Sequence, residues 1–276
     1  MTGADAAAAP LVGRRILVTR RPEQSARLAR GLSSLGATVI EVPTLELAAP
    51  ADPGPLDRAL GRLHRYDWLV FTSANAVRAV RTRLAALGID PGPVGRATHV
   101  AAVGSATSEI FREQFEGGEV SLEPAAGFRA EALAELFAIR GCAHQRMLLP
   151  VSDRARDVLP KALGALGAEV EVVVAYRTVT PEGLAGRLAE AIRPGLDLAV
   201  FASPSAVQGF LDAIGERAQG LPAAVIGPIT EQAAREGGLS VRVVASGSTA
   251  DGLLTAVVRH YQAPPTTPGP DACGGA

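Results

Sequence analysis

The chain has 276 residues, of which 47% are hydrophobic and 20% charged, and its formal net charge is −1. This length fits two domains of ordinary size, and the near-neutral charge does not favour nucleic-acid binding. No apolar run reaches the roughly 20 residues of a membrane helix, and the N-terminal stretch lacks the basic region of a secretory signal. The two cysteines, Cys142 and Cys273, predict neither a disulfide framework nor a thiolate metal site, which favours a reducing cytoplasm.

Both ends of the chain are rich in small residues, proline and glycine, without periodicity. We expect residues 1–12 and 263–276 to be disordered tails.

Between these tails, apolar runs typical of strands alternate with amphipathic helical stretches. A strand "RRILVTR" (14–20), a helix "QSARLARGLSSLG" (24–36) ending at Gly36 and a strand "ATVIEVP" (37–43) follow one another. The same order recurs in "RMLLPVS" (146–152), "ARDVLPKALGALG" (155–167), ending at Gly167, and "AEVEVVVAY" (168–176).

Three further pairs of segments repeat in the same order. They are "VFTSANAV" (70–77) with "VFASPSAV" (200–207), "AAVGSATSEI" (101–110) with "AVIGPITEQA" (224–233), and "GFRAEALAEL" (127–136) with "GSTADGLLTA" (247–256). Matching blocks at spacings of about 120–130 residues indicate a duplicated domain. The predicted fold is α/β, with two similar doubly wound parallel-sheet domains of flavodoxin-like type.

Two extended segments, "PTLELAAPADPGP" (43–55) and "VVVAYRTVTPEG" (172–183), lie at equivalent points of the repeat. We expect them to pair as a two-stranded β bridge between the domains. The first domain is then discontinuous, built from residues 13–44 and 182–262, and the second comprises residues 45–181, including the bridge strands.

In the first two of these three pairs of repeated segments, hydroxyl or amide side chains stand at the turn between a predicted strand and the helix that follows it. In doubly wound sheets ligands bind at these carboxyl ends, where helix N-termini favour anions. Serine, threonine and asparagine are also the preferred helix N-caps whatever the function, so a single such residue leaves both interpretations open. Asn75 and Ser205 lie in the same turns as Ser73 and Ser203. Two matched pairs favour a two-sided cleft for a ligand with several anionic groups: Ser73 with Ser203, and Thr107 with Thr230, the threonines opening their helices.

Other familiar site motifs are missing from the sequence. "VGSAT" (103–107) and "IGPIT" (226–230) are glycine loops without the G-x-G-x-x-G pattern or the P-loop lysine, so nucleotide binding is weakly supported. The four histidines lack metal-ligand spacing, and no G-x-S-x-G elbow is present. Tyr176 ends a strand in the predicted bridge, where it either faces the cleft or packs inside.

Taken in order, these segments resemble those of the uroporphyrinogen-III synthase family. The resemblance extends from about residue 14 to 260, and it rests on the whole ordered set of segments, which includes "AYRTV" (175–179) in the bridge. The other matching segments are "ILVTR" (16–20), "AVGSAT" (102–107), "STADGLL" (248–254) and the two repeated strand-to-helix turns.

The resemblance implies two domains joined by a two-stranded ladder, one of them built from both chain ends. It also implies a lyase of tetrapyrrole and heme biosynthesis. Such an enzyme cyclises hydroxymethylbilane, a linear tetrapyrrole with many carboxylates, with loss of water and inversion of the last pyrrole ring. No cofactor or metal is expected. The enzyme is expected to be a cytoplasmic monomer that contacts hydroxymethylbilane synthase transiently, and to bind neither nucleic acid nor membrane.

The resemblance further implies site residues. Tyr176 is the expected acid that assists departure of the hydroxyl, with a modest contribution because an ordinary tyrosine pKa is about 10. The expected substrate-binding residues are Arg20, Ser73, Ala74, Asn75, Thr107, Arg156, Ser203, Pro204, Ser205, Gly227 and Thr230. Because the proline of "FASPSAV" is absent from "FTSANAV", the two halves are not expected to contact the substrate identically.

Two other functions stay open at this point. One is a non-catalytic synthase-like domain that binds a tetrapyrrole or another polyanion as a sensor or regulatory module. The other is a hinged carrier of a small anionic ligand. Formation of the type III isomer from hydroxymethylbilane distinguishes the enzyme from both.

Overall fold

The computed structural model describes residues 9–92, 94–126, 129–247 and 249–262. The chain divides into two compact units. The terminal unit runs to Glu46 and resumes at Thr180, and the central unit comprises Leu47–Val179. Within the described residues each unit is built on one five-stranded sheet.

The sheet of the terminal unit has the strand order β10-β9-β8-β1-β2, and all its paired neighbours are parallel. Counted along this unit, the order is 2-1-3-4-5, which is the flavodoxin-like arrangement. Its strands are β1 (Arg15–Val18), β2 (Thr38–Glu41), β8 (Leu198–Phe201), β9 (Pro222–Val225) and β10 (Ser240–Val244).

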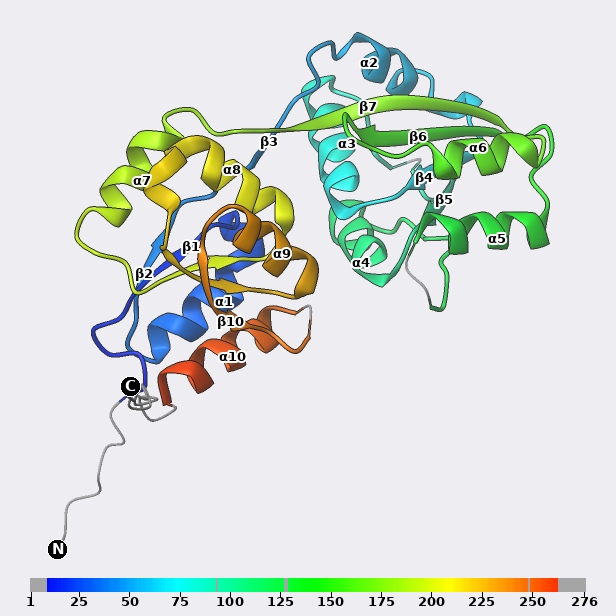
Figure 1. Ribbon diagram of the computed structural model, residues 1–276. Coiled ribbons are helices and arrows are strands. Elements are labelled where there is room, and N and C mark those ends of the chain that lie inside the picture. The colour runs from blue at the N-terminus through cyan, green and yellow to red at the C-terminus, as the bar shows by residue number, and fades with distance from the viewer. Residues whose placement is uncertain (1–8, 93, 127–128, 248, 263–276) are drawn as a thin grey trace, which may run out of the picture. The chain divides into compact units, whose positions relative to one another are not determined.

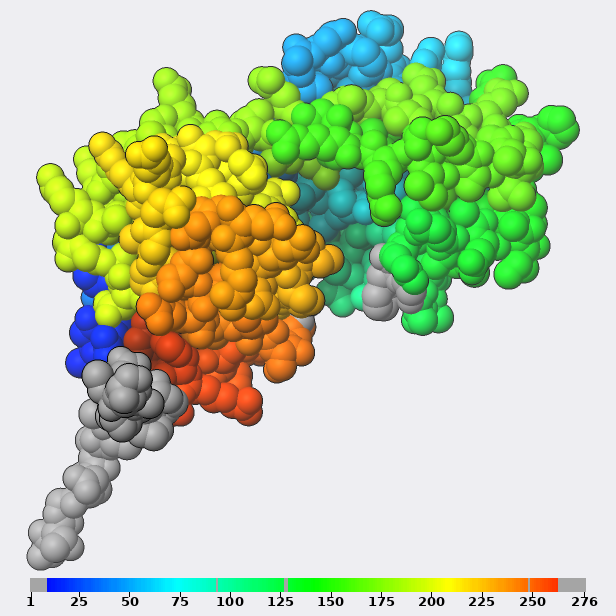
Figure 2. Space-filling view, viewed as in Figure 1, coloured from blue at the N-terminus to red at the C-terminus, as the bar shows by residue number. Residues whose placement is uncertain are grey.

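Helices cover both faces of this sheet (Figure 1). Successive strand residues point to opposite faces, so Phe201 packs with one helical layer and Val200 with the other. Helices α9 and α10 are exposed on the face of this unit seen in Figure 2. The first layer contains α7 (Leu184–Ile192), α8 (Pro204–Ile214), η2 (Gly215–Ala218) and α9 (Pro228–Glu236), and the second contains α1 (Pro22–Ser34) and α10 (Ala250–Gln262).

Part of the predicted N-terminal tail is folded. Leu11 has no exposed surface, packs in the layer of α1 and α10, and its backbone N–H donates to the Leu35 carbonyl at 2.9 Å. The prediction of disorder is therefore wrong for residues 9–12, because one apolar side chain within them completes a core. The rest of that tail and residues 263–276 lie outside the described residues.

The central unit has the strand order β3-β7-β6-β4-β5, in which β7, β6, β4 and β5 are parallel. An isolated parallel bridge between Ala101 and Leu122 continues the sheet beyond β5. From β7 to this bridge, the segments that correspond through the repeat to the five strands of the terminal unit lie in the same spatial order, with β3 added at the outer edge. The strands are β3 (Glu46–Ala48), β4 (Trp68–Phe71), β5 (His99–Ala102), β6 (Arg146–Ser152) and β7 (Glu169–Val179).

Two layers of helices also enclose the central sheet (Figure 1). Phe71 and Phe111 belong to the core on one face, and Trp68 and Phe137 to the core on the other. The first layer contains α2 (Gly54–Leu60), η1 (Leu63–Arg65), α3 (Ala74–Ala86) and α4 (Ser105–Gln114), and the second contains α5 (Ala130–Arg140) and α6 (Val158–Ala165). The predicted fold class is confirmed: the protein has two doubly wound, flavodoxin-like sheets.

The repeated glycines end their helices as predicted. Gly36 follows α1 with φ +94°, and Gly167 follows α6 with φ +86°. This left-handed conformation is accessible to glycine at little cost and lets the chain turn back into the next strand.

The two predicted bridge segments are neighbours, since β3 lies beside β7 in the central sheet. The Arg177 side chain of β7 donates from Nε to the Ala49 carbonyl at 3.0 Å, next to the end of β3. The chain passes between the units at these two strands, at Glu46 in β3 and just after Val179 in β7.

Candidate active site

Ser73 and Ser203 occupy the same position in two matched turns. Each is the extended residue that caps a helix, α3 for Ser73 and α8 for Ser203. Ser73 Oγ accepts from the Ala76 backbone N–H at 3.2 Å, and Ser203 Oγ accepts from that of Ala206 at 3.1 Å. The capping interpretation of these two serines is therefore confirmed, and any ligand-binding role is additional to it.

Thr107 and Thr230 also lie in matched turns, but they do not cap their helices. The caps of α4 and α9 are Gly104 and Gly227, which carry no side chain that could fill the helix end. The threonines follow in the first turn and are only 5% and 3% exposed. The expectation that they open their helices is wrong, because each helix starts two residues earlier.

Tyr176 is a strand residue whose ring is packed in the core of the central unit. It lies near the end of β7, is only 9% exposed, and belongs to the core on the Phe71 face of the central sheet. Its hydroxyl nevertheless reaches the turn after β4, where Oη lies 3.1 Å from Ser73 Oγ. Packing of the ring thus fixes the place of the phenol oxygen.

A cationic pocket of about 380 Å³ opens beside this pair in the central unit. Ser73 and Tyr176 form part of its wall, together with Arg129, Arg154 and Arg156. Its described lining contains no aspartate or glutamate, and no ion pair between described residues involves these three arginines. The pocket is therefore suited to an anionic ligand, and carboxylates match the geometry of guanidinium groups.

The loop between β6 and α6 places Arg154 and Arg156 at this pocket. Its turn is closed by the Ala155 backbone N–H, which donates to the Ser152 carbonyl at 3.1 Å. The two carboxylates of the loop have other partners: Asp153 accepts from the Thr178 N–H at 3.3 Å, and Asp157 pairs with Lys161 at 2.5 Å. The hydrogen bond from Lys161 lowers the pKa of Asp157, so this side chain is ionised yet does not neutralise the arginines.

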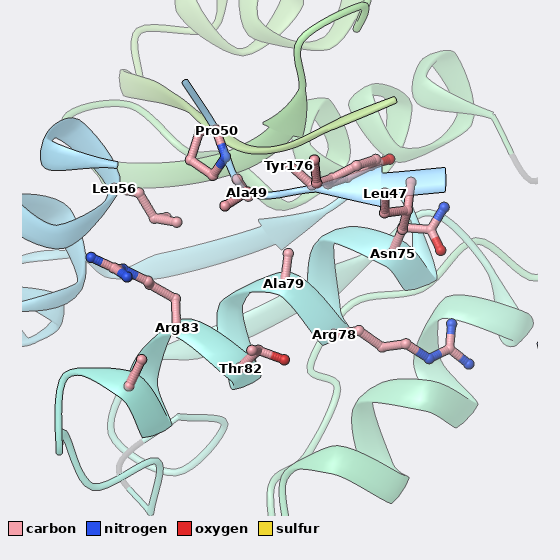
Figure 3. A pocket seen from close by; sticks show the side chains of 13 residues that line it. Leu47, Ala49, Pro50, Leu56, Asn75, Arg78, Ala79, Thr82, Arg83 and Tyr176 are labelled. Carbon is pink, nitrogen blue, oxygen red and sulfur yellow. The ribbon is translucent and has the colours of Figure 1, made fainter. Parts of the chain in front are cut away.

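A second pocket, of about 300 Å³, lies along α3 in the same unit and also includes Tyr176 (Figure 3). Its walls are mostly apolar, with Leu47 and Leu56 among the side chains, and Asn75 lies at the same end as the Tyr176 hydroxyl. Arg83 at the other end is held by Asp57, to which its Nε donates at 2.6 Å. Tyr176 thus separates a cationic pocket from an apolar one.

The remaining predicted residues lie at the carboxyl edge of the terminal sheet. Because β1, β8 and β9 are neighbours, the segments that follow them lie along one edge. Arg20, just after β1, is half-buried, and burial together with the nearby Arg21 lowers its pKa from the ordinary arginine value. The others on this edge are Ser203, Pro204 and Ser205 around the start of α8, and Gly227 and Thr230 around the start of α9.

The structure brings Ser73, Arg156 and Tyr176 to the wall of one pocket, together with two arginines that the sequence reasoning missed. Ala74 and Asn75 follow Ser73 in the first turn of α3. Arg154 stands two residues before Arg156 in the same loop, a signal that could have found it. Arg129 precedes α5, far away in sequence, and only the fold brings it to this pocket.

The described residues contain no group of three or more His, Cys, Asp and Glu side chains that could hold a metal ion. None of their helices combines the length and apolar character needed to cross a membrane.

Comparison with known proteins places the sequence in a family. The family described as "Uroporphyrinogen-III synthase HemD" matches residues 26–255, which is most of the chain. The chain belongs to the uroporphyrinogen-III synthase family.

Curated relatives of this family agree over nearly the whole chain. The chain is 37% identical over 258 residues to "Uroporphyrinogen-III synthase" of Synechococcus elongatus, covering 90% of this chain and 96% of that protein. It is 31% identical over 233 residues to "Putative uroporphyrinogen-III synthase" of Methanothermobacter thermautotrophicus, covering 81% and 89%. A third relative, "Porphyrin biosynthesis protein HemD" of Ruminiclostridium josui, is 29% identical, and the match spans 48% of its length.

Solved structures of uroporphyrinogen-III synthases share the fold. The enzyme of Helicobacter pylori matches with a TM-score of 0.58 at 16% identity, covering 89% of this chain and 99% of that one. A mutant of the Thermus thermophilus enzyme matches with a TM-score of 0.57 at 20% identity, covering 91% and 99%. At these identities the likeness concerns the fold alone.

Proposed function

We propose that this chain performs the reaction of its family, the cyclisation of hydroxymethylbilane to uroporphyrinogen III, with Tyr176 as the proton donor. The observation that carries the role of Tyr176 is the position of its hydroxyl, on the wall of a pocket lined by three arginines and by no described acidic residue. This arrangement offers a proton beside a site for carboxylates.

The first chemical step is loss of the hydroxyl group from the bilane. The C–O bond breaks, the electron pair leaves with oxygen, and that oxygen takes the phenol proton of Tyr176 and departs as water. Electrons of the adjacent pyrrole stabilise the carbocation that remains, and the last pyrrole attacks it with the ring carbon that already carries the bilane chain, which gives a spiro intermediate. The bond from that ring carbon to the chain methylene then breaks, and the methylene carbon bonds to the free α-carbon of the same ring, so that the ring is inverted. The proton lost when the closed ring regains aromaticity restores the phenol, so the cycle needs no other reactant.

The second task is to hold the bilane in one folded shape. Spontaneous closure gives the isomer in which the last ring is not inverted, so the protein must favour the other geometry. Arg129, Arg154 and Arg156 are suited to fix carboxylate arms through charge-assisted hydrogen bonds. The apolar pocket on the other side of Tyr176 is suited to the face of a pyrrole ring.

We assign the residues of the terminal unit to binding as well. Arg20, Ser203, Ser205, Gly227 and Thr230 lie on one edge of its sheet, where helix N-termini and hydroxyls suit further carboxylates. The terminal and central units correspond in this proposal to the predicted domains of residues 13–44 plus 182–262 and of residues 45–181.

The proposal includes a cellular setting. The protein acts in the cytoplasm as a monomer, consistent with its two cysteines and lack of a disulfide framework. A transient contact with hydroxymethylbilane synthase is part of the proposal, because a bilane released into solution closes spontaneously to the wrong isomer.

Incubation of the purified protein with fresh hydroxymethylbilane, followed by separation of the oxidised products, tests the activity. We expect the type III isomer, formed much faster than type I forms in a protein-free control. Type I product alone, at the spontaneous rate, would contradict the proposal. Tight binding of a tetrapyrrole without turnover would instead support the sensor alternative.

A further inference from the structure

The hydroxyl of Ser73 has two neighbours, and the helix cap uses only part of its bonding capacity. Its oxygen accepts from the Ala76 N–H at 3.2 Å and lies 3.1 Å from Tyr176 Oη. A serine hydroxyl has one proton to donate and two lone pairs that accept. With one lone pair directed to Ala76, the proton of Ser73 is free to point at the phenol oxygen.

We propose that Ser73 is a positioning residue for Tyr176: it donates a hydrogen bond to Oη and thereby leaves the phenol proton to point at the substrate. This inference rests on the proposed function. In the opposite arrangement, with Tyr176 donating to Ser73, the phenol proton would be occupied and unavailable to a leaving group.

The contact should strengthen as the reaction proceeds. When the C–O bond of the bilane breaks, the departing oxygen takes the phenol proton and Tyr176 becomes a phenolate. A hydrogen bond from Ser73 to this charged oxygen is stronger than one to the neutral phenol. An interaction that is stronger in the transition state raises kcat and leaves KM nearly unchanged.

The terminal unit lacks this arrangement at its matched turn. Ser203 caps α8 as Ser73 caps α3, but the hydroxyl that reaches this turn comes from the fully buried Thr44. Thr44 Oγ1 donates to the Ala206 backbone carbonyl at 3.1 Å. The cap is therefore common to both units, whereas among the described residues the contact with a tyrosine hydroxyl is found at the central turn alone.

A double-mutant cycle with Ser73→Ala and Tyr176→Phe tests the proposal through formation of the type III isomer. We expect Ser73→Ala to lower kcat about tenfold with KM changed less than about twofold, the size of one charge-assisted hydrogen bond. In the Tyr176→Phe background, Ser73→Ala should have no further effect on kcat, because the phenol that it orients is gone. Ser73→Thr, which keeps both the hydroxyl and the cap, should restore most of kcat.

Thr249→Ala is the control for loss of a helix cap. Thr249 Oγ1 accepts from the Gly252 N–H at 3.0 Å, and this exposed residue lies outside the pockets of the central unit. Thr249→Ala should lower Tm as Ser73→Ala does, with kcat unchanged. A tenfold loss from Ser73→Ala in both backgrounds, or a wild-type kcat for Ser73→Ala, would overturn the positioning role. If wild-type protein forms only type I, the proposed function itself fails, which is a different result.

Discussion

The two strand-to-helix turns at Ser73 and Ser203 have the same backbone and different chemistry. Both serines are extended caps that accept from the backbone N–H three residues later. In the central unit the serine also meets Tyr176 and borders a pocket with three arginines. In the terminal unit a buried threonine hydroxyl reaches the same turn and binds its backbone.

This difference shows that a duplicated turn can keep its capping role in both units while its other side-chain contacts differ. Capping depends on one side-chain oxygen and the helix that follows, so it survives in both copies. A proton donor beside the turn has to come from another strand, and the residue at that place can differ between the two units. In the central unit that strand is β7, and the hydroxyl of its Tyr176 lies 3.1 Å from the turn serine.

The largest expected effect is a loss of stability when a core phenylalanine is truncated, and this loss should be similar in the two units. Phe71 and Phe201 end β4 and β8, are fully buried, and contact Phe111 and Phe210. Truncation to alanine should cost about 3–5 kcal/mol of unfolding free energy in either unit, through lost burial and a residual cavity. Denaturant unfolding gives the free energy of unfolding of both variants. A loss below about 1 kcal/mol in one of them would show that the two cores do not depend equally on their phenylalanines.

The second largest effect concerns enzyme activity, which we expect to fall when a tyrosine hydroxyl is removed from the central unit and to persist when one is removed from the terminal unit. Tyr176→Phe removes the proposed proton donor and should lower kcat for the type III isomer about 100-fold, at the lower end for general acids. Activity should persist, since the pyrrole itself supports departure of the hydroxyl. Tyr261→Phe, which removes a hydroxyl that donates to the Asp197 carbonyl in the terminal unit, is the control and should retain kcat. Complete loss of turnover in a folded Tyr176→Phe protein would show that the tyrosine does more than donate a proton.

We expect substitutions in the cationic pocket to weaken substrate binding and to leave the rate of the chemical step nearly unchanged. Arg156→Ala removes one exposed guanidinium without a described ion pair, and we expect KM to rise about tenfold with kcat changed little. The increase should shrink at high salt, because the charges that attract the substrate are then screened. Arg193→Ala, at the exposed end of α7, is the matched control. An unchanged KM for Arg156→Ala would remove this pocket from the binding site.

The smallest expected effect concerns acid stability. In the central unit, hydrogen bonding to Arg83 lowers the pKa of Asp57 below its ordinary value of 3.8. In the terminal unit, burial by itself raises the pKa of Asp197, but hydrogen bonds from the Arg15 N–H and the Arg14 side chain outweigh it. The pKa of each carboxyl group is lower in the folded state than in the unfolded state. Each carboxylate therefore stabilises the fold at pH values above its ordinary pKa.

That contribution is lost as the pH falls from about 4 toward the lower folded-state pKa. Asp57→Asn should therefore be less stable than wild type at neutral pH, with the difference narrowing in acid. Thermal unfolding as a function of pH measures this narrowing. Asp197→Asn is the counterpart in the other unit, and a constant difference for either variant across this range would contradict the assignment.

The sequence predicted the fold class because the repeat and the alternation of strands and helices are local patterns. Gly36 and Gly167 mark helix ends, and the turn serines mark helix starts, through conformational preferences that act over a few residues. The burial of Leu11 was not predicted, because a single apolar residue beside a sequence of small residues shows no periodicity. Leu11 is nevertheless part of the core of the terminal unit.

The candidate site was predictable only in part, for a physical reason. Ser73, Tyr176 and Arg156 stood out as residues of motifs or of segments shared with the family. Their mutual distances depend on how β4, β6 and β7 line up in one sheet, and Arg129 reaches the pocket from the start of α5, a position that the sequence repeat did not single out. Hydrogen bonds between strands and packing of both sheet faces decide that alignment, so only the tertiary structure gave Tyr176 its serine partner and its cationic pocket.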